Sequence, residues 1–421
     1  MSTTLGTPPR TPLGDTLWLW WLGQPEQPRL IGELAMVRSL RGVSLRYAPQ
    51  WLQLGFALSE DLPLIEQTFL PLLPDTAAGA VDDARPDRWG ERVIRWLDQP
   101  ARLAVLDYLF HAGDERFGAL GVSRAPDRYL PHASAALPHL GDLEDLHRLV
   151  QQVLAGEPVD DPARRRLLAP GATMGGARPK GLIDIDGHPW VIKFNERGET
   201  LDWPLIEHAT LTLAAQAGIR VAPSRALPLH DGLHAVAVRR FDREPGGRRR
   251  HAQSAQVALR AAGEVSGYPE LAQLLRRRGV VADAVHRQQM RELFRRMVFN
   301  ILIDNTDDHD RNHVLLTTRS GELELSPAFD VLPSGQNLGY HQMRVGRQQA
   351  DATLDNAVSE AALFGLAPGE AGDEVSTVAG VVEGWADHFG RCGVTPRDLD
   401  VLAASIDRPF LRGQRVAWRR T

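Results

Sequence analysis

The segment from Asn300 to Asp330 contains the side chains whose types and spacing suit phosphoryl transfer. Its loop holds Asp307 and Asn312, five positions apart, and Asp330 comes after a predicted β-hairpin. Phosphoryl transfer needs a carboxylate that orients a hydroxyl and accepts its proton, together with an amide oxygen and a second carboxylate that hold Mg²⁺ on the phosphates. Protein kinases use this order and spacing. The order favours a metal–phosphate site, although Asp-x-x-x-x-Asn alone is a weak signal because Asp and Asn also cap turns.

A glycine-rich loop precedes this segment, between Gly171 and Lys180. Backbone N–H groups in such a loop can surround phosphate oxygens, because glycine lets the chain approach closely. The loop is not a Walker A sequence, since Ala177 and Arg178 follow Gly176 where Lys and Ser or Thr are required. Taken alone, the loop fits a flexible surface turn as well as a phosphate-binding site.

Lys193 lies inside an apolar predicted strand, Val191–Phe194. A buried ammonium group needs a partner, and the helix predicted next in the chain carries Glu207. A strand Lys paired with a helix Glu holds the α- and β-phosphates in kinase-like enzymes. The alternative is an edge strand from which Lys193 points to solvent.

The elements predicted around these residues form a β-rich small lobe followed by a helical large lobe. Apolar periodicity and turn residues predict strands at 181–186, 190–194, 224–228 and 235–241, and a helix at 203–217. An apolar helical face predicts a long helix at about 283–303, and a hairpin follows at 313–326. From Gln253 onward the remaining chain is predicted to be mostly helical.

These patterns divide the 421 residues into five segments. Residues 1–16 are expected to be disordered. Residues 17–125 form an accessory domain, and the Pro-containing residues 126–165 form a connecting segment with one amphipathic helix. The small lobe is assigned to residues 166–245 and the large lobe with its catalytic loop to residues 246–421. The predicted fold class is α+β, a protein-kinase-like two-lobe fold with an N-terminal accessory α+β domain.

Composition narrows the class of protein further. A hydrophobic fraction of 43% and a charged fraction of 24% are typical of a soluble globular protein. The net charge of −5 provides no global basic field for nucleic acid. Cys392 is the only cysteine, which excludes an intrachain disulfide and suits a reducing cytoplasm. No apolar run approaches the roughly 18 residues of a membrane span, and the first residues do not resemble a signal peptide, so a cytoplasmic location is expected.

Three further features are less informative. His309 could tune a base at Asp307, but a loop histidine bonded to a backbone carbonyl is the commoner arrangement. Arg248–Arg250 with His251 could touch DNA phosphates beside a DNA-binding partner, but a solvated loop is the preferred interpretation. Cys392 has no surrounding nucleophile motif and is interpreted as a packed or surface thiol.

The order and spacing of several motifs resemble the HipA family, serine/threonine kinases that act as toxins in bacterial toxin–antitoxin pairs. The resemblance spans most of the chain, and no single motif carries it. The motifs lie at Phe56–Leu64, Ala84–Gly90 and Gly113–Leu120 in the N-terminal domain, and at Gly175–Lys180, Phe241–Arg243, Asn305–His313 and Leu325–Asp330 in the kinase part.

The resemblance implies a role for each candidate residue. Asp307 corresponds to the catalytic Asp, and Asn312 and Asp330 correspond to the Mg²⁺ ligands. ATP would be bound by the phosphate-loop residues and by the lobe connection near adenine, a set that comprises Gly175, Gly176, Ala177, Lys193, Glu207, Arg239 and Phe241. Some members carry Glu at the position of Arg239, and neither His-Arg-Asp nor Asp-Phe-Gly is present in this chain.

Family members also phosphorylate themselves on a hydroxyl residue just ahead of the phosphate loop, which switches the kinase off. Thr173 is the hydroxyl residue at that place, and capping of a turn is its alternative role. The resemblance further implies a small HipB-like DNA-binding antitoxin, with DNA bound only through it, and a protein substrate such as a tRNA synthetase or another translation factor.

Two other functions remain open from the residues. Antibiotic-type small-molecule phosphotransferases also use Asp-x-x-x-x-Asn with a later Asp, but the segment at 17–124 favours a protein kinase of toxin type. A catalytically silent antitoxin-binding module is the third hypothesis. The presence of Asp307, Asn312, Asp330 and Lys193 together argues against it, since a silent fold has no physical need for all four.

Overall fold

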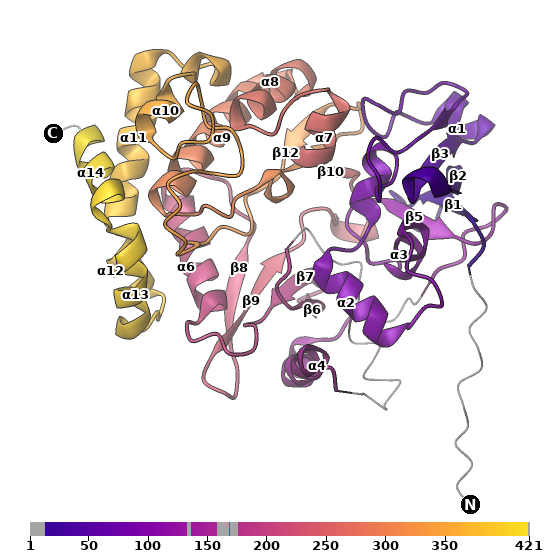
Figure 1. Cartoon of the computed structure of the whole chain (residues 1–421), viewed down its shortest axis with the longest axis horizontal. Coiled ribbons are helices and arrows are strands. Elements are labelled where there is room, and N and C mark those ends of the chain that lie inside the picture. The colour runs from indigo at the N-terminus through magenta and orange to yellow at the C-terminus, as the bar shows by residue number, and fades with distance from the viewer. Residues whose placement is uncertain (1–12, 133–135, 158–167, 169–175, 420–421) are drawn as a thin grey trace, which may run out of the picture.

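The computed structural model describes residues 13–132, 136–157, 168 and 176–419. An N-terminal domain, a small lobe and a large lobe follow one another along the chain and pack together (Figure 1). Among the residues described, no helix combines the length and apolar character needed to cross a membrane.

A five-stranded antiparallel sheet forms the core of the N-terminal domain. Its strands are β1 (Thr16–Trp21), β2 (Arg29–Val37), β3 (Gly42–Tyr47), β4 (Thr68–Phe69) and β5 (Leu120–Ser123), in the order β4-β3-β2-β1-β5. Leu17 and Leu19 alternate on the buried face of β1, as a half-buried strand requires. They share a hydrophobic cluster with Leu106 and Leu109 of helix α3 (Val105–His111), whereas the short helix α1 (Pro49–Leu54) contributes Trp51.

Helix α2 (Arg88–Leu97) links the N-terminal domain to the small lobe. The Asp87 carboxylate caps the helix by accepting a hydrogen bond from the Gly90 backbone N–H at 2.8 Å. Trp89 and Val93 belong to the hydrophobic cluster of the small-lobe sheet, not to that of the N-terminal sheet. Helix α2 therefore belongs to the N-terminal segment of the chain but packs in the hydrophobic core of the small lobe.

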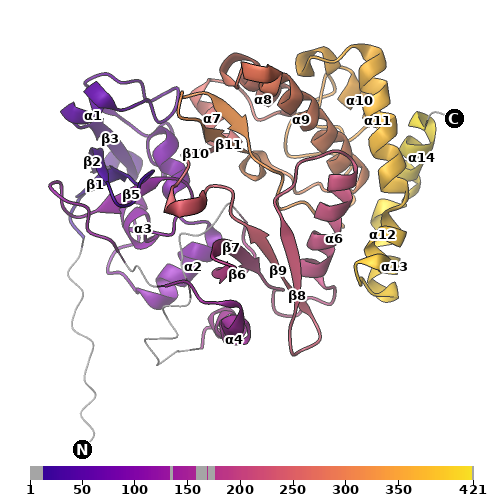
Figure 2. The same cartoon turned by 180° about the vertical axis from the view of Figure 1, so that it is seen from behind.

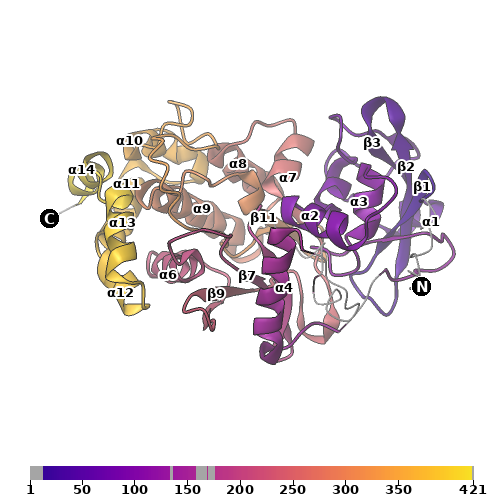
Figure 3. The same ribbon diagram turned by 60° about the horizontal axis from the view of Figure 1, so that its bottom comes forward.

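The small lobe is a four-stranded antiparallel sheet with one helix on each face. Strands β6 (Lys180–Ile185), β7 (His188–Lys193), β8 (Ser224–Pro228) and β9 (His234–Arg239) lie in the order β6-β7-β9-β8. Val236 and Val238 face the core that contains helix α6 (Trp203–Gln216). Ala235 and Ala237 face the cluster that contains helix α4 (Leu143–Ala155). Figure 3 shows the two helices on opposite sides of the sheet.

Helix α4 is the amphipathic helix predicted in the connecting segment. Its buried face, which includes Leu146, Leu149 and Val150, packs on the small-lobe sheet. Leu168 joins the same cluster. The helix therefore completes the hydrophobic core of the small lobe as well as connecting the two domains.

The large lobe is mostly helical, as predicted. Its helices are α7 (Ala255–Ala261), α8 (Tyr268–Arg278), α9 (Val285–Leu302), α10 (Leu354–Val358), α11 (Pro368–Glu383), α12 (Trp385–Arg391), α13 (Pro396–Ile406) and α14 (Pro409–Trp418). Helix α9 lies in the lobe core and leads into the candidate catalytic loop, whereas α12, α13 and α14 run along the outer side (Figure 2).

In the two lobes, the predicted elements are found within a few residues of their expected positions, with one strand missed. The Asp186-Gly187 turn has positive φ at both residues, as a type I′ hairpin requires. The predicted hairpin consists of β11 (Val314–Thr317) and β12 (Leu323–Leu325). It gains a third strand, β10 (Ala252–Ser254), where mostly helical chain was expected. Three residues are too few to show a period, so only the pairing with β11 identifies this strand.

A buried charge network joins the N-terminal domain to the kinase part. Asp242 accepts hydrogen bonds from the Gly118 backbone N–H at 2.8 Å and from the Arg240 guanidinium. Arg240 in turn donates to the backbone carbonyls of Glu115 and Arg116. Burial opposes the charge on Asp242, but the Arg240 and Arg243 guanidiniums lower its pKa to about 2. Two motifs that are far apart in the sequence, 113–120 and 241–243, thus contact each other directly.

Candidate active site

Lys193, Glu207 and Asp330 meet where the small and large lobes contact each other. Strand β7 is an interior strand, and the Lys193 side chain is 9% exposed. Its Nζ atom donates to Glu207 Oε1 on α6 at 2.7 Å and to Asp330 Oδ1 at 2.5 Å. The predicted Lys193–Glu207 pair is therefore present in the structure, and the solvent-facing alternative for Lys193 is wrong.

The electrostatics of the three groups follow from burial and charge. Burial opposes ionisation of Asp330, but the ammonium groups of Lys193 and Lys180 lower the pKa of this carboxyl to about 2. Burial also opposes the charge on Lys193, yet its two carboxylate partners hold the pKa of Lys193 above its usual range. Burial raises the pKa of Glu207 above its usual value against the opposing effect of Lys193. Asp330 is therefore ionised at neutral pH.

The backbone around Asp330 fixes the direction of its carboxylate. Ala328 donates its backbone N–H to the Arg220 carbonyl at 2.7 Å and accepts from the Ala222 N–H at 2.9 Å, which ties the segment to the small lobe. The next residue, Phe329, is buried. Asp330 then adopts a left-handed conformation with φ of 56°, which Asp tolerates better than most residues. The turn directs the carboxylate toward Lys193.

Gly176 lies beside the Asp330 carboxylate. A Cβ atom at this glycine would lie 3.0 Å from Lys180 Nζ and 3.9 Å from Asp330 Oδ2, and its φ of 103° is unfavourable for other residues. Lys180 Nζ also donates to Asp87 Oδ2 of the N-terminal domain at 2.9 Å. A glycine is required here because of both its backbone conformation and the adjacent ammonium group. Ala177 is exposed beside it, and Gly175 and Thr173 lie outside the described residues.

In the candidate catalytic loop, the neighbouring carboxylates of Asp307 and Asp308 have different surroundings. Asp308 is buried, where it accepts hydrogen bonds from the Tyr268 hydroxyl and from His313 Nε2. Asp307 is exposed and accepts one hydrogen bond, from Gln342 Nε2 at 3.0 Å. Asp308 is thus part of the framework of the loop, whereas the Asp307 carboxylate is exposed at its surface.

Asn312 has the features of a cation ligand. Its side chain is 5% exposed, and its Oδ1 atom is buried without a hydrogen-bond partner among the residues described. A buried amide oxygen without a partner is costly, and Mg²⁺ prefers carboxylate and carbonyl oxygens. The donor chemistry of Asn312 Oδ1 and of the Asp330 carboxylate therefore fits Mg²⁺.

Phe241 and Arg239, the two residues predicted to contact adenine, are placed differently. Phe241 lies near Asp330, whereas the Arg239 side chain points away from Lys193. Phe241 lies 5.4 Å from the Phe329 ring, next to Asp330, and 5.8 Å from the Phe117 ring. Arg239 pairs with Trp190, whose side chain faces the α4 side of the sheet, and its Nη2 lies 3.2 Å from the His188 ring nitrogens. The Arg239 guanidinium thus points away from Lys193, because alternate residues of a strand face opposite sides. Only its main chain remains a candidate for a nucleotide contact.

Two features of the site escaped sequence reasoning. Asp87 lies in a noted motif, but its contact with Lys180 spans 93 positions and leaves no local pattern. His309 is near enough to Asp330 to lower the pKa of that carboxyl, and its Nδ1 is buried without a hydrogen-bond partner among the described residues.

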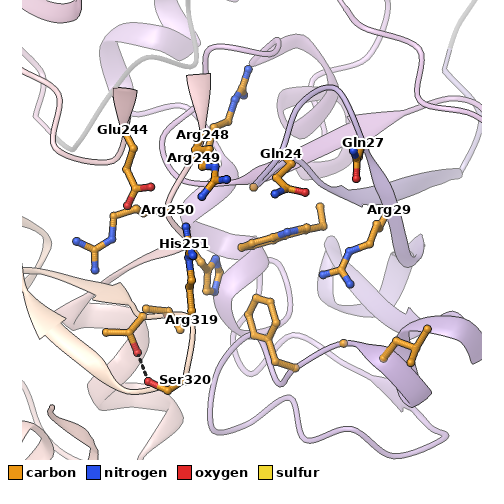
Figure 4. A pocket seen from close by; sticks show the side chains of 18 of the residues that line it. Gln24, Gln27, Arg29, Glu244, Arg248, Arg249, Arg250, His251, Arg319 and Ser320 are labelled. Carbon is orange, nitrogen blue, oxygen red and sulfur yellow. Dashed lines mark hydrogen bonds between the residues drawn. The ribbon is translucent and has the colours of Figure 1, made fainter. Parts of the chain in front are cut away.

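The arginine triplet 248–250 lines a separate cavity of about 1110 Å³ between the N-terminal domain and the large lobe (Figure 4). Arg249 donates to the Asp114 carbonyl at 2.5 Å, and Arg250 pairs with Glu324 at 2.5 Å. Arg248 is exposed. His251 is buried behind them, with its Nε2 bonded to the Leu58 carbonyl at 2.8 Å. Arg249 therefore holds the large lobe to the N-terminal domain, and Arg250 forms an ion pair within the large lobe, in contrast to the expected solvated loop.

The fold and this site define a protein-kinase-like, two-lobe protein with an N-terminal accessory domain. The family model described as the HipA-like C-terminal domain matches residues 172–385, just over half of the chain. The chain therefore belongs to the HipA family.

Comparison with a solved HipA structure agrees with this fold. HipA from the Shewanella oneidensis MR-1 complex of HipA, HipB and operator DNA superposes with a TM-score of 0.60 at 19% identity, over 96% of each chain. The Helicobacter pylori proinflammatory kinase CtkA aligns with a TM-score of 0.43 at 11% identity, over 58% of this chain and 93% of its own. No curated protein sequence matches this chain.

Proposed function

We propose that this protein is an ATP- and Mg²⁺-dependent serine/threonine protein kinase that acts as a HipA-type toxin. The observation that carries the proposal is the buried Lys193–Glu207–Asp330 arrangement, in which a cation from the small lobe meets a carboxylate from the large lobe. A buried Lys between two carboxylates contributes little to stability when hydrophobic packing is the alternative. Binding of nucleotide phosphates would give the Lys193 ammonium group a functional role that stability alone does not explain.

Each side chain has a separate task in the proposed reaction. Asp307, exposed and lightly held by Gln342, orients the substrate hydroxyl and accepts its proton. Lys193 leaves Asp330 to contact the α- and β-phosphates while it keeps Glu207 as its buried partner. Asn312 and Asp330 would hold Mg²⁺, which neutralises charge on the transferred phosphoryl group when bound.

The proposed partners follow from family membership. The Shewanella HipA was solved with HipB and its operator DNA, and we extend a HipB-like antitoxin and DNA contact through it to this chain. The net charge of −5 supports the indirect route, because tight DNA binding needs clustered Lys and Arg. Co-purification with the product of the neighbouring gene checks this. Tight, sequence-specific DNA binding by the chain alone would contradict it.

The experiment that tests the kinase is labelling of a cell lysate with γ-labelled ATP and identification of the modified protein. A labelled protein whose signal depends on Mg²⁺ and disappears with Asp307→Asn supports the proposal. Equal signals from both proteins, or labelling confined to small molecules, would refute it. The latter result would favour the antibiotic-type phosphotransferase.

Thr173 is the proposed self-phosphorylation site. A phosphate on this residue adds about −1.5 to −2 charges, which would repel incoming nucleotide phosphates from the adjacent loop. Phosphosite mapping after incubation with ATP and Mg²⁺, with Asp307→Asn as control, should find the modification. Phosphate elsewhere but never on Thr173, or a Thr173→Ala protein that loses activity in ATP as fast as the parent, would remove this role.

A further inference from the structure

A cluster of metal-ligating side chains lies in the N-terminal domain, apart from the kinase cleft. Asp98 follows the end of α2, His111 is the last residue of α3, and His132 lies in the chain after β5. One potential ligand atom from each of these side chains lies within 4.8 Å of those from the other two. Three segments that are separate in the sequence therefore converge on one point.

The imidazole groups of this cluster have nitrogen atoms without hydrogen-bond partners. His111 Nδ1 and His132 Nε2 are both buried, and neither forms a hydrogen bond within the described part of the chain. The His111 side chain is 10% exposed, and its Nδ1 lies 3.3 Å from Asp98 Oδ2 without hydrogen-bond geometry. Leaving a buried polar atom unpaired costs on the order of 1–3 kcal/mol. A cation bound among the three side chains would remove that cost at both nitrogens.

We propose that Asp98, His111 and His132 form a binding site for a divalent transition-metal ion of the zinc class. Two imidazole nitrogens and one carboxylate oxygen are a ligand set that Zn²⁺ accepts, with a fourth position left for water. Zinc bonds of about 2.0–2.1 Å place tetrahedral ligands roughly 3.4 Å apart. His111 Nδ1 and Asp98 Oδ2 already lie 3.3 Å apart, close to this value.

The surrounding charges favour a nitrogen-seeking ion over Mg²⁺ or Ca²⁺. The Arg116 and Arg124 guanidiniums lie near His132 and repel positive charge there, whereas the Asp98 carboxylate attracts it. The two guanidiniums oppose added positive charge, so the affinity must come from imidazole donation, which suits Zn²⁺, Co²⁺ or Ni²⁺.

The bound ion would join the C-terminal ends of α2 and α3. The opposite end of α2 carries Asp87, which holds Lys180 beside the kinase cleft. The site would thus stabilise the helix that connects the N-terminal domain to the small lobe. This inference does not depend on the proposed kinase activity.

The test is metal titration of the full-length protein after removal of metals with a chelator. Co²⁺ is the optical probe and Zn²⁺ the competitor, with excess Mg²⁺ present because Mg²⁺ prefers the oxygen ligands near Asp330. The parent should bind one Co²⁺ with the absorption of a nitrogen-containing site, and Zn²⁺ should displace it and raise the melting temperature. His132→Ala and Asp98→Asn should each weaken binding at least tenfold and abolish the thermal shift.

His139→Ala is the matched control, since its side chain is exposed in the following segment and lies outside the cluster. It should bind both metals as the parent does. Circular dichroism of the metal-free variants confirms folding, and Asp98→Asn serves if His132→Ala does not fold. Equal affinity in the parent, His132→Ala and Asp98→Asn would overturn the proposal, as would Co²⁺ binding that only Asp330→Asn removes.

Discussion

Asp87 of the N-terminal domain and Lys180 of the small lobe form an ion pair, with a carboxylate oxygen 2.9 Å from Nζ and both side chains almost fully buried. The pair sits where α2 begins and where the phosphate-loop segment enters β6. Lys180 also lowers the pKa of Asp330, so this contact connects the accessory domain to the electrostatics of the candidate active site. The N-terminal domain therefore contributes to the candidate active site itself.

Asp87→Asn should destabilise the protein by about 1.5–3 kcal/mol, the usual worth of a hydrogen bond to a charged group. The substitution keeps an oxygen that can cap α2 and removes only the charge, so the loss reports the pairing with Lys180. It should also weaken ATP binding, because it removes the carboxylate charge that holds Lys180 beside Gly176. Urea unfolding and nucleotide titration measure the two effects.

The control for this variant is Asp145→Asn, which breaks an exposed ion pair with Arg148. Such pairs contribute about 0–1 kcal/mol, so little change is expected. A double-mutant cycle with Lys180→Gln then isolates the coupling. A coupling energy near zero would show that Asp87 acts only as a helix cap.

Asp307→Asn should abolish phosphoryl transfer while ATP binding and folding stay intact. A positioned general base contributes on the order of 10²–10⁴-fold, and the exposed Asp307 has no framework role that its loss would disturb. Asp310→Asn is the matched control in the same loop, where Asp310 accepts a hydrogen bond from Gln256. Transfer rates within a few-fold of the parent for Asp307→Asn would exclude it as the base.

Asn312→Ala and Asp330→Ala should both reduce the dependence of nucleotide binding on Mg²⁺. Asn312 Oδ1 has no hydrogen-bond partner within the described residues, so Asn312→Ala removes no hydrogen bond of this oxygen. Asp330→Ala, in contrast, also removes a hydrogen-bond acceptor of Lys193. Asn312→Ala should therefore keep its stability, and Asp330→Ala should change it. Calorimetric titration of ATP with and without Mg²⁺ distinguishes the effects, and unchanged Mg²⁺ dependence in both variants would rule out the metal role.

Local sequence patterns predicted the parts of the site but not their assembly. Lys193 was recognisable because an ammonium group inside an apolar strand needs a carboxylate, and Glu207 came next in the chain. Its second bond, to Asp330, spans 137 positions and depends on how the two lobes close. The side of the sheet that Arg239 faces follows from the pairing of β9 with β7, which a single strand does not reveal. The structural role of Asp308 could not be predicted either. Asp307 and Asp308 are adjacent residues of the same type, and only the packing around them shows that one is exposed and the other buried.

The junction between the N-terminal domain and the large lobe should weaken in mild acid because of His251. This side chain is 2% exposed, and it lies 5.9 Å from the Trp21 ring and 5.8 Å from the Phe56 ring. Burial lowers the pKa of His251 to about 4 from a usual 6.5, and the bond to the Leu58 carbonyl opposes this only in part. The unfolded chain therefore binds a proton below about pH 6.5, while the folded protein does not until about pH 4.

The sign of the effect follows from this difference in proton binding. The contribution of His251 to the free energy of unfolding is complete above pH 6.5 and is lost as the pH falls to 4, up to roughly 3 kcal/mol at 1.36 kcal/mol per pKa unit. His251→Gln keeps a donor for the Leu58 carbonyl and removes the titration, so its stability should depend less on pH. Urea unfolding at pH 7.0 and 4.5 measures this, with the exposed His139→Gln as control. His341, whose pKa burial also lowers to about 4, leaves a residual slope in every variant. Equal slopes for the parent and His251→Gln would show that the junction does not respond to this histidine.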